Sequence, residues 1–137
     1  MKTEIFTLCD AATEAGSKLN LLGSFDHIHA RETPVTHPLC AIAIKIRFAK
    51  IEEGNHRLKI TFVDADGKLV LPSLDASIAV RCGDDESTVA ANVVLCIQQL
   101  KLQSFGEYSI DLAIDGRLEG SIPLYVKRIK DQVTQRK

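Results

Sequence analysis

Residues 105–126 restrict the fold more than any other stretch of this chain. Apolar side chains stand at every second position over 108–114 and again over 122–126. Such alternation is typical of strands that bury one face. Asp115-Gly116 separates the two runs, and this dipeptide readily adopts the positive φ angles of a two-residue hairpin turn. The segment therefore predicts an antiparallel β-hairpin.

The same two-residue period recurs along the chain, whereas no segment has the 3.6-residue period of a helix. It predicts further strands at 2–9, 18–29, 40–48, 56–64, 75–82 and 88–98. The strands 40–48 and 56–64 are expected to pair as a hairpin around the turn at 52–55.

Two connections are predicted to lack strand structure. Residues 10–17 are small and polar and suit a loop or a single helical turn, and 31–38 contain two prolines and suit an irregular connection.

Eight or nine short strands separated by turns predict an all-β fold. We expect an antiparallel β-sandwich of the immunoglobulin-like, Greek-key style, with a β-barrel as the alternative. Tyr108 follows Leu102 and Gly106 at the start of a strand, as in a tyrosine corner, where the hydroxyl bonds to upstream backbone. The alternative is a tyrosine at the strand edge with its hydroxyl in water. Residues 1–126 are predicted to form one domain and 127–137 a flexible tail. That tail holds five basic residues and one acid.

The composition limits the classes of partner. With 137 residues, the chain is long enough to bury a core without disulfides or metals. A net charge of −1 argues against a nucleic-acid partner. The chain starts without a signal-peptide pattern and has no apolar run of about 20 residues, so we expect no membrane association and a cytoplasmic location. The four cysteines lack CxxC spacing and are expected to be small buried hydrophobes.

Three patterns together resemble a known family. They are Leu8-Cys9-Asp10, the run KLNLLGSFD at 18–26, and the closing pattern formed by Gly106-Glu107-Tyr108, Asp115-Gly116 and Pro123-Leu124-Tyr125-Val126. Over nearly the whole chain they are similar to a family of short, uncharacterised bacterial proteins that form a domain of unknown function. That family tends to have a second glycine where this chain has Ser17. The resemblance implies a β fold and a bacterial, intracellular setting, and it transfers no catalytic residues.

Histidines form the first candidate site. His27 and His29 are two apart, so on a strand both rings would lie on one face, where they could bind one metal ion. His37 follows after the proline-containing connection and is the candidate third ligand. The alternative is that these histidines face solvent at a strand end.

Acidic loops form the second candidate. If the strands simply alternate in direction, the loops at 10–17, 51–55, 83–87 and 115–116 lie at one end of the sandwich. The acidic residues of these loops are Glu14, Glu52, Glu53, Asp84, Asp85, Glu86 and Asp115. Together they would attract a cation or a basic partner, with Glu52, Glu53, Asp84, Asp85 and Glu86 as the binding residues. The alternative is that loops are charged because they are solvated.

No nucleophile motif or phosphate-binding loop occurs in the sequence. We therefore expect a non-catalytic binding or assembly module without a cofactor. The strand at 88–98 and the terminal hairpin offer edges for a protein partner or for homodimerisation. The alternative function is a small metal-binding protein or metal-dependent enzyme that uses His27 and His29.

Overall fold

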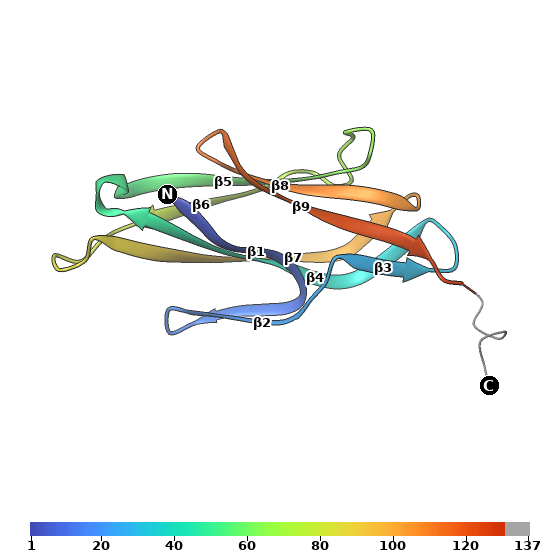
Figure 1. The fold of residues 1–137 in the computed structure, drawn as a ribbon, viewed down its shortest axis with the longest axis horizontal. Coiled ribbons are helices and arrows are strands. Elements are labelled where there is room, and N and C mark those ends of the chain that lie inside the picture. The colour runs from blue at the N-terminus through green and yellow to red at the C-terminus, as the bar shows by residue number, and fades with distance from the viewer. Residues whose placement is uncertain (131–137) are drawn as a thin grey trace.

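The computed structural model describes residues 1–130, which form nine strands in two facing sheets (Figure 1). The strands are β1 (Lys2–Ala15), β2 (Lys18–Ser24), β3 (His27–Ala30), β4 (Val35–Ala49), β5 (Gly54–Val63), β6 (Leu74–Val80), β7 (Thr88–Leu102), β8 (Gly106–Ile114) and β9 (Arg117–Arg128). One short 3₁₀ helix, Lys50–Glu52, joins β4 to β5.

The strand order confirms the predicted sandwich. One sheet has the order β2-β1-β4-β7 and the other β3-β9-β8-β5-β6. All neighbours are antiparallel except β3 and β9, which are parallel. The strands β1, β4 and β7 occupy the positions of immunoglobulin strands A, B and E, and β5, β8 and β9 those of C, F and G. Within residues 1–130 no hydrogen-bonded ladder joins the sheets into a barrel.

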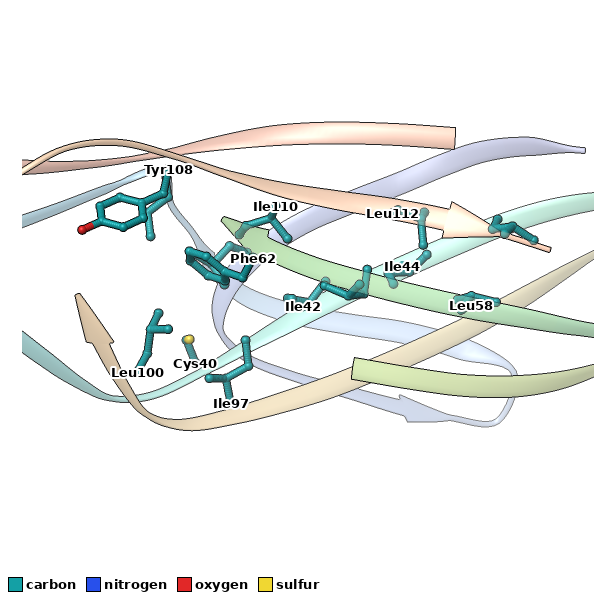
Figure 2. Close-up of a cluster of buried hydrophobic side chains, with 14 of the residues drawn as sticks. Cys40, Ile42, Ile44, Leu58, Phe62, Ile97, Leu100, Tyr108, Ile110 and Leu112 are labelled. Carbon is teal, nitrogen blue, oxygen red and sulfur yellow. The ribbon is translucent and has the colours of Figure 1, made fainter. Parts of the chain in front are cut away.

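The core lies between the two sheets and is made of side chains two positions apart (Figure 2). The fully buried large side chains that face each other include Ile42, Ile44, Ile46 and Phe48 of β4 and Ile110, Leu112 and Ile114 of β8. Each such side chain stabilises the fold by about 1.5–3 kcal/mol relative to an exposed position. No polar or charged residue of the described chain is fully buried in this core.

The predicted tyrosine corner is present. The Tyr108 hydroxyl donates to the Ser104 carbonyl at 2.7 Å and accepts from the Ser104 backbone N–H at 3.2 Å. The ring is buried and meets Phe62 edge to face. The corner therefore fixes the connection between β7 and β8 where the chain crosses from one sheet to the other.

The terminal hairpin is also confirmed. Asp115 and Gly116 have φ angles of 52° and 82°, as the tight turn requires. However, β5 flanks β8, and β3 pairs with β9 only over Tyr125–Arg128. The prediction that the hairpin offers an edge was wrong for these parts, because alternation identifies a strand and not its neighbours. Residues 117–124 of β9 pair only with β8 in the described structure.

The predicted hairpin of 40–48 with 56–64 was wrong for the same reason. β4 pairs with β1 and β7, whereas β5 pairs with β6 and β8 in the opposite sheet. Both strands bury an alternating apolar face against one core, but they approach it from opposite sides.

Several predicted boundaries differ from the structure. Residues 10–15 are strand and not loop, the segment 18–29 is split between two sheets, and Val35–Pro38 already belong to β4. β9 extends to Arg128, so the first residues of the predicted tail lie in the sheet. Residues 131–137 of that tail lie outside the described part of the chain.

The strands that replace the predicted loop at 10–17 form a third layer of the fold. Residues 10–24, here called the arm, form a hairpin that leaves the sheet after Cys9 and folds back over its outer face (Figure 1). Beneath the arm Cys9, Ala41 and Ala43 are fully buried. β4 is consequently buried on both faces, and its alanines allow the arm to approach closely.

The cysteines were predicted to be buried, and two of them are. Cys9 and Cys40 are buried, and burial raises the pKa of the Cys40 thiol to about 11. Cys82 is half-buried and Cys96 is exposed on the outer face of β7, so the prediction was wrong for Cys96. The reason is that the arm covers β4 but leaves this part of β7 open.

We expect Tyr108→Phe to lower the free energy of unfolding by about 1–2 kcal/mol, because it removes the hydroxyl that joins Ser104 to the core. Urea denaturation with an unchanged m value measures this loss. Tyr125→Phe is the matched control, since Tyr125 lies on the outer face of β9. Equal losses for the two variants would contradict a structural role for the corner.

We expect Gly23→Ala to loosen the arm. Gly23 has φ +68°, and an added Cβ would lie 2.4 Å from the Asp10 Oδ2. Gly16→Ala is the control, because Gly16 has φ +59° and open space around it. Backbone strain costs about 1–3 kcal/mol at either position. The additional clash at Gly23 should also raise the alkylation rate of Cys9, read by mass spectrometry, while Cys40 stays protected. An unchanged Cys9 rate would show that the Asp10 side chain accommodates the methyl group.

Candidate functional site

The predicted histidine ligands do not converge. His27 and His29 lie on β3 with nearly parallel rings whose centroids are 6.2 Å apart. His37 lies on β4, in the other sheet, and its ring packs against Phe25. Within residues 1–130 no group of three or more His, Cys, Asp or Glu residues is placed to hold a metal ion.

One shallow hollow is lined by two of the three predicted histidine ligands. His27 and His37 line it together with Asp10, and its volume is about 370 Å³. The Asp26 carboxylate, however, is hydrogen-bonded to the His27 Nδ1. The geometry of the described chain therefore does not favour the metal-dependent alternative.

The predicted acidic loops do lie at one end of the sandwich, near the N-terminus (Figure 1). Several of their carboxylates form hydrogen bonds or ion pairs with neighbouring parts of the same end. Glu52 accepts from the Ala49 N–H at 2.8 Å and pairs with the Met1 amino group at 3.0 Å. Glu53 accepts from the Cys82 N–H at 2.7 Å. These two carboxylates therefore connect neighbouring loops.

The remaining carboxylates of this end follow a similar pattern. Glu86 accepts from the Gly83 N–H, whereas Asp84 and Asp85 are exposed. Glu14, on the arm, lines a hollow beside β7. The same loops and strand ends also carry the basic residues Lys50, Arg57, Arg81 and Arg117. These basic residues offset part of the negative charge, and binding of a cation or a basic partner here stays a prediction.

His56 holds this end together. Its Nδ1 lies 2.6 Å from the Asp115 carboxylate and its Nε2 lies 2.7 Å from the Glu52 carbonyl. Both partners are acceptors, and a neutral imidazole has only one N–H, so this geometry requires the doubly protonated ring. Accordingly, the Glu52 carbonyl and the Asp115 carboxylate raise the pKa of His56. The ring also stacks on Phe48 of the core.

Asp115 shows the complementary effect. The Arg57 backbone N–H and the His56 ring lower the pKa of its carboxyl group. The imidazolium thus joins the β8–β9 turn to the β4–β5 connection, and its role is structural.

A different surface lies where the sandwich is open at its side. β6 and β7 are the terminal strands of the two sheets on this side, and each pairs with only one neighbour. Their inward side chains are only partly buried although they pack against the core. These half-buried residues are Leu74, Ala76 and Ile78 of β6 and Val89, Ala91, Val93 and Leu95 of β7. We call this surface the β6–β7 seam. A hollow of about 460 Å³ lies at one end of it.

The arm reaches the seam from the outer face. The Asn92 Nδ2 of β7 donates to the Ser17 carbonyl at the arm tip at 3.3 Å. The arm thereby supports β7 from behind and leaves its free edge unpaired in the described structure.

The composition of β7 distinguishes it from the other terminal strands. From Thr88 to Leu100 it contains no charged residue, no proline and no glycine. Natural sheets usually protect a free edge with charges, prolines, bulges or shortness. β2 carries Lys18 and Gly23, β6 carries Asp75, and β3 has only four residues. The β7 edge is therefore the least protected of the four.

The strand at 88–98 was predicted to be an edge, and its terminal position in the sheet confirms this. The β6–β7 seam was not predicted. The uncharged run was visible in the sequence, but only the strand order shows that β6 lies opposite β7.

Comparisons with known proteins agree with this fold. The model of a family of unknown function, DUF6941, matches residues 4–127, which confirms the resemblance found in the sequence. No curated protein is similar enough to the chain to count as a relative. No helix in residues 1–130 is long and apolar enough to cross a membrane.

One similar solved structure is "Pseudomonas fluorescens alkylpurine DNA glycosylase AlkC bound to DNA containing an abasic site analog". The match has a TM-score of 0.51 and 8% identity, and it covers 92% of this chain and 30% of that one. At this identity the likeness shows the fold alone. The chain spans less than a third of that protein's length.

We expect the stability of the protein to depend on the protonation of His56. Its folded pKa lies above the unfolded value of about 6.5, so its contribution is complete below that pH and is lost as the pH rises through the folded pKa. The loss should be about 1 kcal/mol, because the pair is only partly shielded from solvent.

Urea denaturation across the neutral to mildly alkaline range measures this loss. His56→Ala should flatten the pH dependence, whereas the control His29→Ala, on exposed β3 surface, should keep it. A steep dependence that persists in His56→Ala would show that another group is responsible.

Proposed function

The chain belongs to the DUF6941 family, whose function is unknown, and we propose that it is a non-catalytic binding or assembly module that takes up an additional β-strand along β7. The observation that carries this proposal is the uncharged free edge of β7 beside the half-buried seam. An unpaired edge presents a row of backbone N–H and C=O groups that an incoming strand satisfies.

The seam adds apolar contacts to these backbone bonds. An added strand would continue the four-stranded sheet toward β6 and cover the partly buried side chains of β7. Main-chain hydrogen bonds then supply affinity, and the alternate pockets beside Val89, Ala91 and Val93 supply selectivity.

The polar groups of the described chain support a non-catalytic role. The two histidines that pair with carboxylates, His27 and His56, have no serine or cysteine bonded to them. The serine hydroxyls of Ser109 and Ser121 bond to each other and to the Asp111 carboxylate, and no histidine takes part in these bonds. A nucleophile needs an adjacent base within hydrogen-bond reach to act at neutral pH.

The lack of charge along the β7 edge also limits the class of partner that it can bind. Nucleic acid is held mainly by lysine and arginine contacts to phosphates, and residues 88–100 offer none. We therefore propose a protein strand as the ligand of β7. A bacterial, cytoplasmic setting remains our expectation from the sequence.

Two lysines on the exposed face of β7, Cys96→Lys with Gln98→Lys, should weaken association with partners at least tenfold, because charges oppose strand addition. Ser77→Lys with Ala79→Lys is the matched control, with two lysines on the exposed face of β6. Quantitative affinity capture from host-cell extract compares both with the original chain, after circular dichroism verifies folding. Partners retained equally by the β7 variant, or no association of any kind, would contradict the proposal.

A further inference from the structure

We propose that the strand added along β7 is the β7 strand of a second copy, antiparallel and related by a two-fold axis. The two sheets would merge into one continuous sheet with the central order β1-β4-β7-β7-β4-β1, and the arm of each copy would lie over its outer face. This inference rests on the proposed function, because it names the partner of the same edge.

Charge is the first reason for a second copy. A two-fold axis places a strand opposite itself, so charged residues near the axis meet residues of the same charge. A strand that pairs with itself is therefore best without charges, whereas a strand that recognises a different protein gains selectivity from complementary ones. Residues 88–100 carry no charge at all.

The matching of faces is the second reason. In a two-fold antiparallel pair, inward side chains meet inward side chains when the axis passes through a residue position. With the axis at Val93, Val93 faces its own copy and Ala91 faces Leu95. Val89 then faces Ile97 on the same core side. All three pairs are apolar, and directly opposed Cβ atoms lie about 4.5–5.5 Å apart.

The outward-facing residues of β7 are equally compatible with this two-fold pairing. With the same axis, Asn92 lies opposite Val94 and Ala90 lies opposite Cys96. These residues are uncharged, and Cys96 is exposed in the described chain. The contact would thus shield the exposed thiol side of β7 as well as the seam.

The backbone limits how far the pairing extends. Gln99 has a φ of 54°, which interrupts regular extended geometry after Gln98. The segment 88–98 precedes this interruption, and at about 3.3 Å per residue it offers an edge of roughly 35 Å. The other terminal strands are less suitable: β3 has four residues and β2 has a positive φ at Gly23.

Sedimentation equilibrium of the purified full chain tests the proposal directly. We expect a species of twice the 15.0 kDa chain mass that dissociates on dilution. Cys96→Lys with Gln98→Lys should weaken this association at least tenfold and leave the circular dichroism spectrum unchanged. The β6 control, Ser77→Lys with Ala79→Lys, should remain dimeric.

Hydrogen exchange of the unmodified chain provides a second test that needs no variant. Amides of an unpaired edge strand alternate between protected and exchanging positions, whereas paired edges protect them all. We expect continuous protection over 88–98 at high protein concentration and alternating protection on dilution. A chain that stays at 15.0 kDa at every concentration, or a dimer in which alternate β7 amides still exchange, would overturn the proposal.

These measurements distinguish a failure of self-pairing from a failure of the proposed function. A monomeric chain that binds another protein with new protection of the β7 amides would overturn self-pairing and leave strand uptake intact. A chain whose β7 amides gain protection in no complex would overturn both.

Discussion

Close packing of aliphatic side chains between the two sheets is the interaction on which the rest of the structure depends. Ile42 and Ile44 of β4 face Ile110 and Leu112 of β8, and these side chains are almost fully removed from water (Figure 2). Because branched aliphatic residues fill this space without polar atoms, the core is stable without a disulfide or a metal. The loops, the arm and the free edges are held in place by this two-sided core.

The surfaces of the sandwich differ in how completely their polar groups are hydrogen-bonded. At the loop end, carboxylates bond to backbone N–H groups, and the His56 imidazolium joins two loops. These bonds satisfy the polar groups that connect the loops, as folded proteins require. Along β7, by contrast, one row of backbone groups faces outward beside half-buried aliphatic side chains. We base the proposed binding edge on this difference.

The arm connects these two regions. It covers the alanines of β4 from outside, and its tip bonds to Asn92 of β7. A third layer on the outer face stiffens the strand whose opposite edge is free. A preorganised edge loses less conformational entropy when another strand is added.

Two-residue alternation in the sequence determined the fold class and most strand positions. The Asp115-Gly116 dipeptide determined the terminal turn, and the position of Tyr108 indicated the tyrosine corner. These features depend on residues close together in the chain, where side-chain period and turn geometry act locally. The loops at 51–55, 83–87 and 115–116 lie at one end as expected, whereas residues 10–15 form an additional strand that the predicted strand count lacks. The sequence further showed that residues 88–100 carry no charge.

Tertiary structure alone decided which strands are neighbours. It placed β5 opposite β4 and beside β8, folded the arm over β4 and put His37 in the other sheet from His27 and His29. The physical reason is that alternation states only that one face of a strand is buried. Every strand of a sandwich buries its face against the same core, so hydrogen-bond partners, and with them the free edges, are fixed by how the whole chain packs.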